Sequence, residues 1–208
     1  MARSTPPDEV VAMTGQRLVD QRGTEFFFDA GATCFDFAYT GGEGPYEVFE
    51  QLHEPQDLAV WLQHHVLGDD VVLEVTTREL RTARTLRNVL LRVLWDVAAG
   101  RTPSVDDVEV INSAAQVAPL VPEWEPGADG VTWRGPVRVG QVLSVLAREA
   151  IGILSDPPPG RIRQCEGDHC PLTFLDTSRP GVRRWCAMER CGNRRKVRAH
   201  RARHAPNN

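Results

Sequence analysis

Four of the five cysteines lie near the C-terminal end of the chain, and they constrain its fold more than any other feature. Cys165 and Cys170 form one pair and Cys186 and Cys191 a second, with four residues inside each pair and fifteen between the pairs. Structural zinc takes four tetrahedral ligands, which two such cysteine pairs can supply. A bound metal would also hold together a segment too small to build its own core. We therefore predict that these four cysteines bind one structural zinc ion.

Two other roles for these cysteines are open. Disulfides are disfavoured, because the N-terminal residues MARSTPPDEV carry acids and no apolar signal region, so we expect a cytoplasmic protein with reduced thiols. An iron–sulfur cluster also takes four cysteines, but no redox cofactor or partner motif accompanies them. Zinc binding is therefore favoured over disulfides and over an iron–sulfur cluster. No apolar run approaches the roughly 20 residues that span a bilayer, so we expect no membrane association.

Charge divides the chain at the proline-rich segment 155–160. Residues 1–160 carry 12 basic and 24 acidic groups, a net charge of −12, whereas the remainder carries 12 basic and 4 acidic groups, a net charge of +8. Three consecutive prolines cannot continue a helix and are typical of a stiff spacer. We therefore predict an N-terminal domain over 16–157 and a small domain over 161–204, with separate cores.

Hydrophobic periodicity in the first domain predicts an α+β fold dominated by helices, with short β-hairpins. The aromatic runs 25–29 and 33–40 are expected to form one hairpin, and segments 120–124 and 131–134 a second. Residues 1–15 are polar and are expected to be a loose terminus. Helices are expected over about 58–66, 77–99, 104–116 and 142–154.

The second domain has the element order of a small treble-clef-like zinc finger. Residues 172–175 and 182–185 flank a turn-rich segment and predict a hairpin. After Cys191, good helix formers continue without a breaker until Pro206. A cysteine turn, a hairpin and a helix that starts at the last ligand follow one another in treble-clef fingers.

The tetrapeptide Cys191-Gly-Asn-Arg194, together with the spacing of the cysteine pairs, resembles the CGNR zinc finger over residues 165 to about 203. Proteins with this finger usually carry an N-terminal ABATE domain, which residues 24–157 resemble more loosely. The early ABATE motif corresponds to Phe35-Asp-Phe-Ala-Tyr-Thr40, where Tyr39 replaces the usual Asn. The resemblance implies a stress- or ligand-responsive transcription regulator. The 23 arginines against one lysine favour a bacterial source with a GC-rich genome.

The expected C-terminal helix is a candidate DNA-binding element. Over 191–203 it would extend about 20 Å, with Arg194, Arg198 and Arg201 on one face and Val197 toward the finger core. Such a helix fits the major groove, where arginine pairs with guanine, and its cations would contact phosphates. The absence of an aromatic stacking platform favours duplex DNA over RNA. The predicted nucleic-acid-binding residues are Arg183, Arg184, Arg194, Arg195, Lys196, Arg198 and Arg201.

Two alternatives to DNA binding stay open. The basic surface could cover the acidic first domain, or it could dock on a protein or RNA partner in a zinc-finger interaction adaptor without DNA-sequence readout. An enzyme is not expected, because the sequence contains no glycine-rich phosphate loop, nucleophile elbow or His-Glu-x-x-His motif.

The first domain is expected to sense an effector or to dimerise. Asp36, Tyr39 and Thr40 are candidates for the rim of a pocket for an unknown small molecule. For Asp36, an outward-facing position on a strand is the simpler alternative. A homodimer is a hypothesis only, because no heptad seam is visible.

Overall fold

The computed structural model describes residues 14–124, 126 and 131–203, and for residues 199–203 the backbone alone. Most of the expected loose terminus, residues 1–13, lies outside this range. The helix-dominated α+β fold is confirmed, with short two-stranded sheets beside the helices. None of the helices in the described ranges is long and apolar enough to cross a bilayer.

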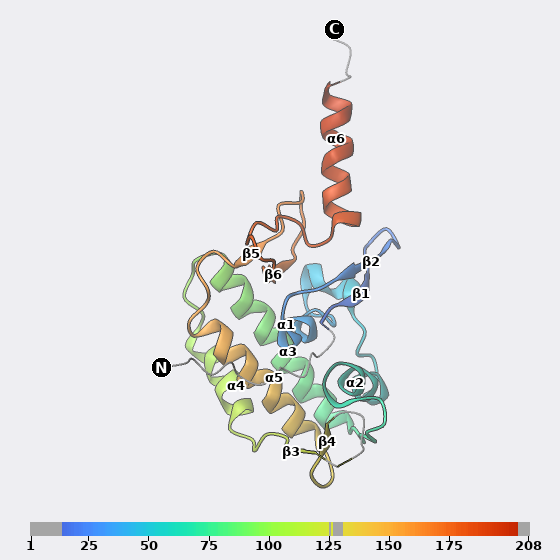
Figure 1. The fold of residues 1–208 in the computed structure, drawn as a ribbon, viewed down its shortest axis with the longest axis vertical. Helices are drawn as coiled ribbons and strands as arrows, with labels where there is room; N and C mark the ends of the chain where they lie inside the picture. The colour runs from blue at the N-terminus through green and yellow to red at the C-terminus, as the bar shows by residue number, and fades with distance from the viewer. Residues whose placement is uncertain (1–13, 125, 127–130, 204–208) are drawn as a thin grey trace.

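Helix α3 (Thr77–Ala98) is the centre of the body (Figure 1). It begins with a capping box in which the Thr76 hydroxyl accepts the N–H of Glu79 and the Glu79 carboxylate accepts the N–H of Thr76. Its apolar face is buried, and α1, α2, α4 and α5 pack against it. These helices span Thr33–Ala38 (α1), Pro55–Leu62 (α2), Val105–Ala115 (α4) and Val139–Leu154 (α5), with a 3-10 turn η1 (Gly44–Phe49) and a π-helical turn η2 (Gln63–Leu67).

The first hairpin differs from the sequence prediction. Strand β1 (Gln16–Val19) pairs antiparallel with β2 (Glu25–Phe28), and the segment from residue 33 is helix α1 rather than a strand. Carboxylate oxygens of Glu149 in α5 accept the first free N–H groups of this helix, at 3.3 Å from Thr33 N and 2.7 Å from Cys34 N. All six residues of α1 are buried, so hydrophobicity alone could not separate helix from strand.

The second predicted hairpin is present as β3 (Pro122–Glu123) and β4 (Thr132–Trp133), although most of its loop lies outside the described residues. In the finger, β6 (Thr173–Leu175) pairs with β5 (Ile162–Gln164). The expected strand over 182–185 is therefore wrong. Its backbone serves other partners, because Asp176 accepts the N–H of Arg183 at 2.8 Å and the carbonyl of Arg184 accepts the N–H of Glu166 at 2.9 Å.

The expected C-terminal helix is present. A π-helical turn η3 (Met188–Gly192) carries the last cysteine and continues into α6 (Asn193–Arg203). Figure 1 shows α6 pointing away from the helical body, with its base close to the β1–β2 hairpin. Val197 does not face the finger core as expected, since 48% of its surface is exposed.

The finger and the body share one hydrophobic core, so the expectation of separate cores is wrong. Leu172 and Phe174 of the finger are fully buried in the same cluster as Phe28 and Tyr39 of the body. Backbone hydrogen bonds also cross the junction, for example from Leu175 N to Ala30 O at 2.9 Å. The proline-rich segment therefore joins two parts that pack directly on each other, and the predicted domain bounds stay a prediction.

Candidate zinc centre and nucleic-acid interface

The four cysteines come together in space. The sulfurs of Cys165, Cys170, Cys186 and Cys191 all lie within 4.8 Å of one another. The Sγ atoms of Cys170 and Cys186 are 3.8 Å apart, and those of Cys186 and Cys191 are 3.6 Å apart. A tetrahedron with Zn–S bonds of about 2.3 Å has edges of about 3.8 Å. The donor set and its geometry thus fit one structural zinc ion.

Backbone groups shape this centre from the inside. The N–H groups of Gly167 and Cys186 point at the Cys165 sulfur, at 3.4 and 3.2 Å. A Cβ atom on Gly167 would lie only 2.5 Å from the Sγ of Cys191. With any other residue at this position, the loop between the first two cysteines would have to shift away from Cys191.

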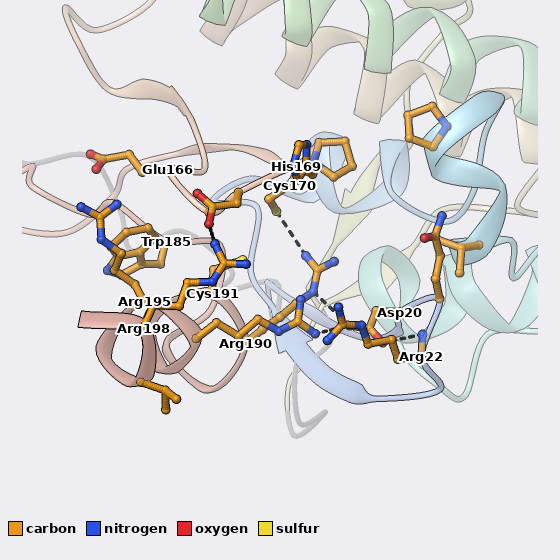
Figure 2. Close-up of a pocket in the computed structure, with 18 of the residues that line it drawn as sticks. Asp20, Arg22, Glu166, His169, Cys170, Trp185, Arg190, Cys191, Arg195 and Arg198 are labelled. Carbon is orange, nitrogen blue, oxygen red and sulfur yellow. Dashed lines mark hydrogen bonds and ion pairs between the residues drawn. The ribbon is translucent and has the colours of Figure 1, made fainter. Parts of the chain in front are cut away.

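A side chain that the sequence analysis did not single out contacts the sulfurs directly. The Arg190 guanidinium donates from Nη1 to Cys170 Sγ at 3.2 Å and approaches Cys186 Sγ at 3.7 Å. Only 9% of the Arg190 side chain is exposed, and its guanidinium carbon lies 4.5 Å from the centre of the Phe26 ring. Its Nε is 3.6 Å from a carboxylate oxygen of Asp20 in the body. Arg190 thus lies between the cysteine cluster and the β1–β2 hairpin (Figure 2).

Asp20 receives a second arginine from the finger. Its Oδ2 pairs with Arg194 Nη2 at 2.7 Å, and its Oδ1 accepts the backbone N–H groups of Arg22 and Thr24 at 3.0 and 3.1 Å. Burial opposes ionisation of this carboxyl, but the hydrogen bonds from Arg194, Arg22 and Thr24 outweigh it and lower the pKa of Asp20 to about 2. Asp20 is therefore a charged anchor for the base of α6 at neutral pH.

A third contact holds the same hairpin. The Glu189 carboxylate accepts the backbone N–H of Phe27 in β2 at 2.6 Å. Residues 189–194 therefore contact the hairpin on both sides of its turn. Sequence alone offered no signal for these pairs, because the partners are more than 160 residues apart in the chain.

Two predicted DNA-binding arginines are engaged within the finger. The Arg183 guanidinium lies 4.1 Å from the centre of the Phe174 ring and donates to the carbonyls of Trp185 and Cys186. Arg184 pairs with Glu166, although 53% of its side chain is exposed. The geometry favours a structural role for Arg183 and leaves Arg184 at the surface.

The predicted residues on α6 differ in their surroundings. Arg194 pairs with Asp20, and Arg198 pairs with Asp168 while 66% of its side chain remains exposed. Arg195 and Lys196 are exposed, and neither forms an ion pair with the part of the chain that the structure describes. The side chain of Arg201 lies outside the described residues.

The three candidate effector residues are buried. Asp36 accepts the N–H groups of Gly15 and Ala30 at 2.6 and 2.8 Å, and burial raises its pKa to about 7. The Tyr39 hydroxyl oxygen accepts the N–H of Thr173, and the Thr40 hydroxyl donates to the Phe37 carbonyl. Asp36 therefore does not face outward, and an effector role for the three residues stays a prediction.

Two cavities border the finger. One, of about 530 Å³, lies between the turn of the β1–β2 hairpin, the cysteine loop and the base of α6, and Figure 2 shows Arg22, His169, Trp185 and Arg195 among its lining residues. The other, of about 340 Å³, is lined by Tyr46, Asn88, Leu91, Trp95 and Pro171 among others. The second cavity is thus bounded by both the body and the finger.

Comparison with protein families matches both parts of the chain. Residues 31–157 match the family model for ABATE, described as a putative stress-induced transcription regulator. Residues 161–204 match the CGNR zinc finger. A search of curated proteins finds no match to the sequence.

Proposed function

Because the chain belongs to the ABATE family of transcription regulators and carries a CGNR zinc finger, we propose that it regulates transcription by binding duplex DNA through α6. The observation that carries this proposal is the exposure of Arg195 and Lys196 on a helix that points away from the body (Figure 1). A cytoplasmic location is part of this proposal, because cysteine thiols that bind zinc stay reduced there.

The dimensions and charges of α6 suit this role. A helix about 10–12 Å wide fits the major groove, which is about 12 Å wide. Arg195 and Lys196 would contact phosphates first. Arg194 pairs with the buried Asp20, whereas both partners of the Arg198–Asp168 pair are exposed, and exposed ion pairs are typically worth about 0–1 kcal/mol. A phosphate could therefore replace Asp168 as the partner of Arg198 at little cost.

Fluorescence anisotropy with a labelled duplex tests the proposal. The zinc-loaded chain should bind, and its affinity should fall steeply between about 50 and 200 mM salt. The variants R195A and K196A should each weaken binding to all sequences and reduce the salt slope by about 1. The matched control is R17A, which removes an exposed arginine on β1 that pairs with Glu25 on β2. Absence of binding, or binding that salt does not affect, would contradict the proposal.

A zinc-finger interaction adaptor is the second candidate. The pairs of Arg184, Arg194 and Arg198 with carboxylates of the chain itself favour it, because these cations already have partners. Capture of partners from nuclease-treated and untreated extract distinguishes the two functions, since a protein partner survives nuclease treatment. Partners lost on treatment with DNase, but kept on treatment with RNase, support DNA binding.

We further propose that the body senses a small molecule. The 340 Å³ cavity has the size of a small-ligand site, and the Tyr46 hydroxyl donates at 3.0 Å to the carbonyl of Pro171, the residue after Cys170. A ligand there would contact the finger directly. Thermal-shift screening of the chain against a panel of small apolar molecules, with W95A as the comparison, tests this idea. Small molecules that stabilise W95A as much as the wild type would place the binding site elsewhere.

Dimerisation of the chain is a separate hypothesis, which light scattering tests.

A further inference from the structure

We propose that Arg190 and Asp20 are outer partners of the zinc centre, and that through them zinc binding is coupled to docking of the β1–β2 hairpin against the finger. This inference concerns the metal site and the body, and it does not depend on DNA binding.

The charge of the centre explains why it needs such a partner. A zinc ion held by four thiolates carries a net charge of −2, and three of the four cysteines are buried. Buried charge is costly unless it is paired and hydrogen-bonded. Among the residues that the structure describes, Arg190 is the cation whose side chain donates to the sulfurs.

The position of Arg190 makes this charge compensation depend on the body. Its guanidinium is held between the sulfurs of the finger, the ring of Phe26 and the carboxylate of Asp20. Asp20 in turn pairs with Arg194 at the base of α6. Figure 2 shows the contacts that lead from Cys170 to Arg190 and from Arg190 to Asp20. The hairpin therefore supplies both a packing surface and a counter-charge to the arginine at the metal site.

The coupling follows from geometry. Zinc is the group that would hold the turns carrying Cys170 and Cys186 together, and Arg190 needs both sulfurs at their present positions. Without the metal, the two turns can separate, and Arg190 loses its acceptors. Residues 189–194 are then no longer held in place by the contacts between Arg190 and the sulfurs. Their own contacts with the hairpin, including the hydrogen bond that Glu189 accepts from Phe27 N, should weaken.

Zinc release from the full-length protein tests the first half of the proposal. A chromogenic chelator reports the rate and the affinity. Loss of an outer-shell partner typically lowers metal affinity by about 10–100-fold. The zinc affinity of R190Q should therefore fall by about that factor, and R190K should restore part of the lost affinity. The control R184Q removes an exposed arginine that pairs with Glu166 in the same finger, and it should bind zinc as the wild type does. Zinc affinity of R190Q equal to wild type would overturn the proposal.

Hydrogen exchange tests the second half. The Phe27 amide should be protected in the zinc-loaded chain and should lose protection by a measurable factor when a chelator removes zinc. Amides inside α5 serve as an internal control for global unfolding, because they lie in the helical core. The variant D20N should show reduced Phe27 protection even with zinc bound. Phe27 protection that is unchanged by zinc removal, or that falls by no larger a factor than the protection of the α5 amides, would contradict coupling through this contact.

Discussion

The phenol oxygen of Tyr39 in α1 accepts the backbone N–H of Thr173 in β6, with 2.7 Å between oxygen and nitrogen. Tyr39 is 1% exposed and Thr173 1% exposed, so this bond joins body and finger inside the shared core. The aromatic residue that departs from the ABATE motif is therefore a structural link to the finger.

Removing that oxygen tests the link. The variant Y39F leaves a buried N–H without its acceptor, which typically costs about 1–3 kcal/mol. Urea denaturation should show a lower midpoint with an unchanged slope. The control Y46F removes a half-buried hydroxyl that donates to Pro171 O, and it should cost less. A Y39F chain as stable as the wild type would mean that Thr173 N has another partner.

Loss of the zinc centre should destabilise the whole chain. Phe174 and Leu172 belong to the same buried cluster as the body, so C186S should lower the unfolding midpoint of body and finger together. Circular dichroism, which follows the body helices, and hydrogen exchange in the finger should give the same midpoint. A chelator should move the wild type to that midpoint and leave C186S unaffected. A body that melts at the wild-type midpoint in C186S would restore the idea of two independent cores.

Stability should fall as pH rises toward neutrality, because of Asp36. Burial, aided by the nearby Asp29 and Glu149, raises its pKa from 3.8 to about 7 in the folded chain. Between these values the folded state holds a proton that the unfolded state has lost, so raising the pH favours unfolding. The stabilisation is fully present below pH 3.8 and is lost through about pH 7. Denaturant melts at pH 5 and pH 8 should show the drop, and D36N should flatten the difference between them whatever its absolute stability.

Sequence patterns predicted the parts of this structure that local chemistry determines. The spacing of Cys165 and Cys170 identified one half of the metal site, and the run of helix formers after Cys191 identified α6. The segment from Thr33 to Ala38 was mistaken for a strand because it is buried on all sides. Its N-terminus is capped by the carboxylate of Glu149, which lies 116 positions away in the sequence from Thr33. Long-range partners leave no periodic trace in a sequence.

The same limit explains why Arg190 and Asp20 were missed. An arginine next to a cysteine in a basic segment looks like one more surface cation, and an acid in an acidic domain looks like a solvated charge. Their roles depend on a hairpin that packs against the finger across 170 residues of sequence. Charge counts correctly indicated opposite signs in the two parts, and the structure pairs some of those charges with each other.

Gly167 offers a test of the metal site that leaves every ligand in place. In G167A the new methyl group would lie 2.5 Å from the Sγ and 2.9 Å from the Cβ of Cys191. The loop between Cys165 and Cys170 must therefore move away from Cys191, the fourth zinc ligand. We expect zinc to leave G167A faster than wild type in the chelator assay. The control G152A changes an exposed glycine in α5 where a Cβ meets nothing within 4 Å, and alanine there should stabilise the helix by about 0.5–1 kcal/mol. Wild-type zinc retention by G167A would show that the loop can pass the metal by another path, and that its present course is not required by the tetrathiolate site.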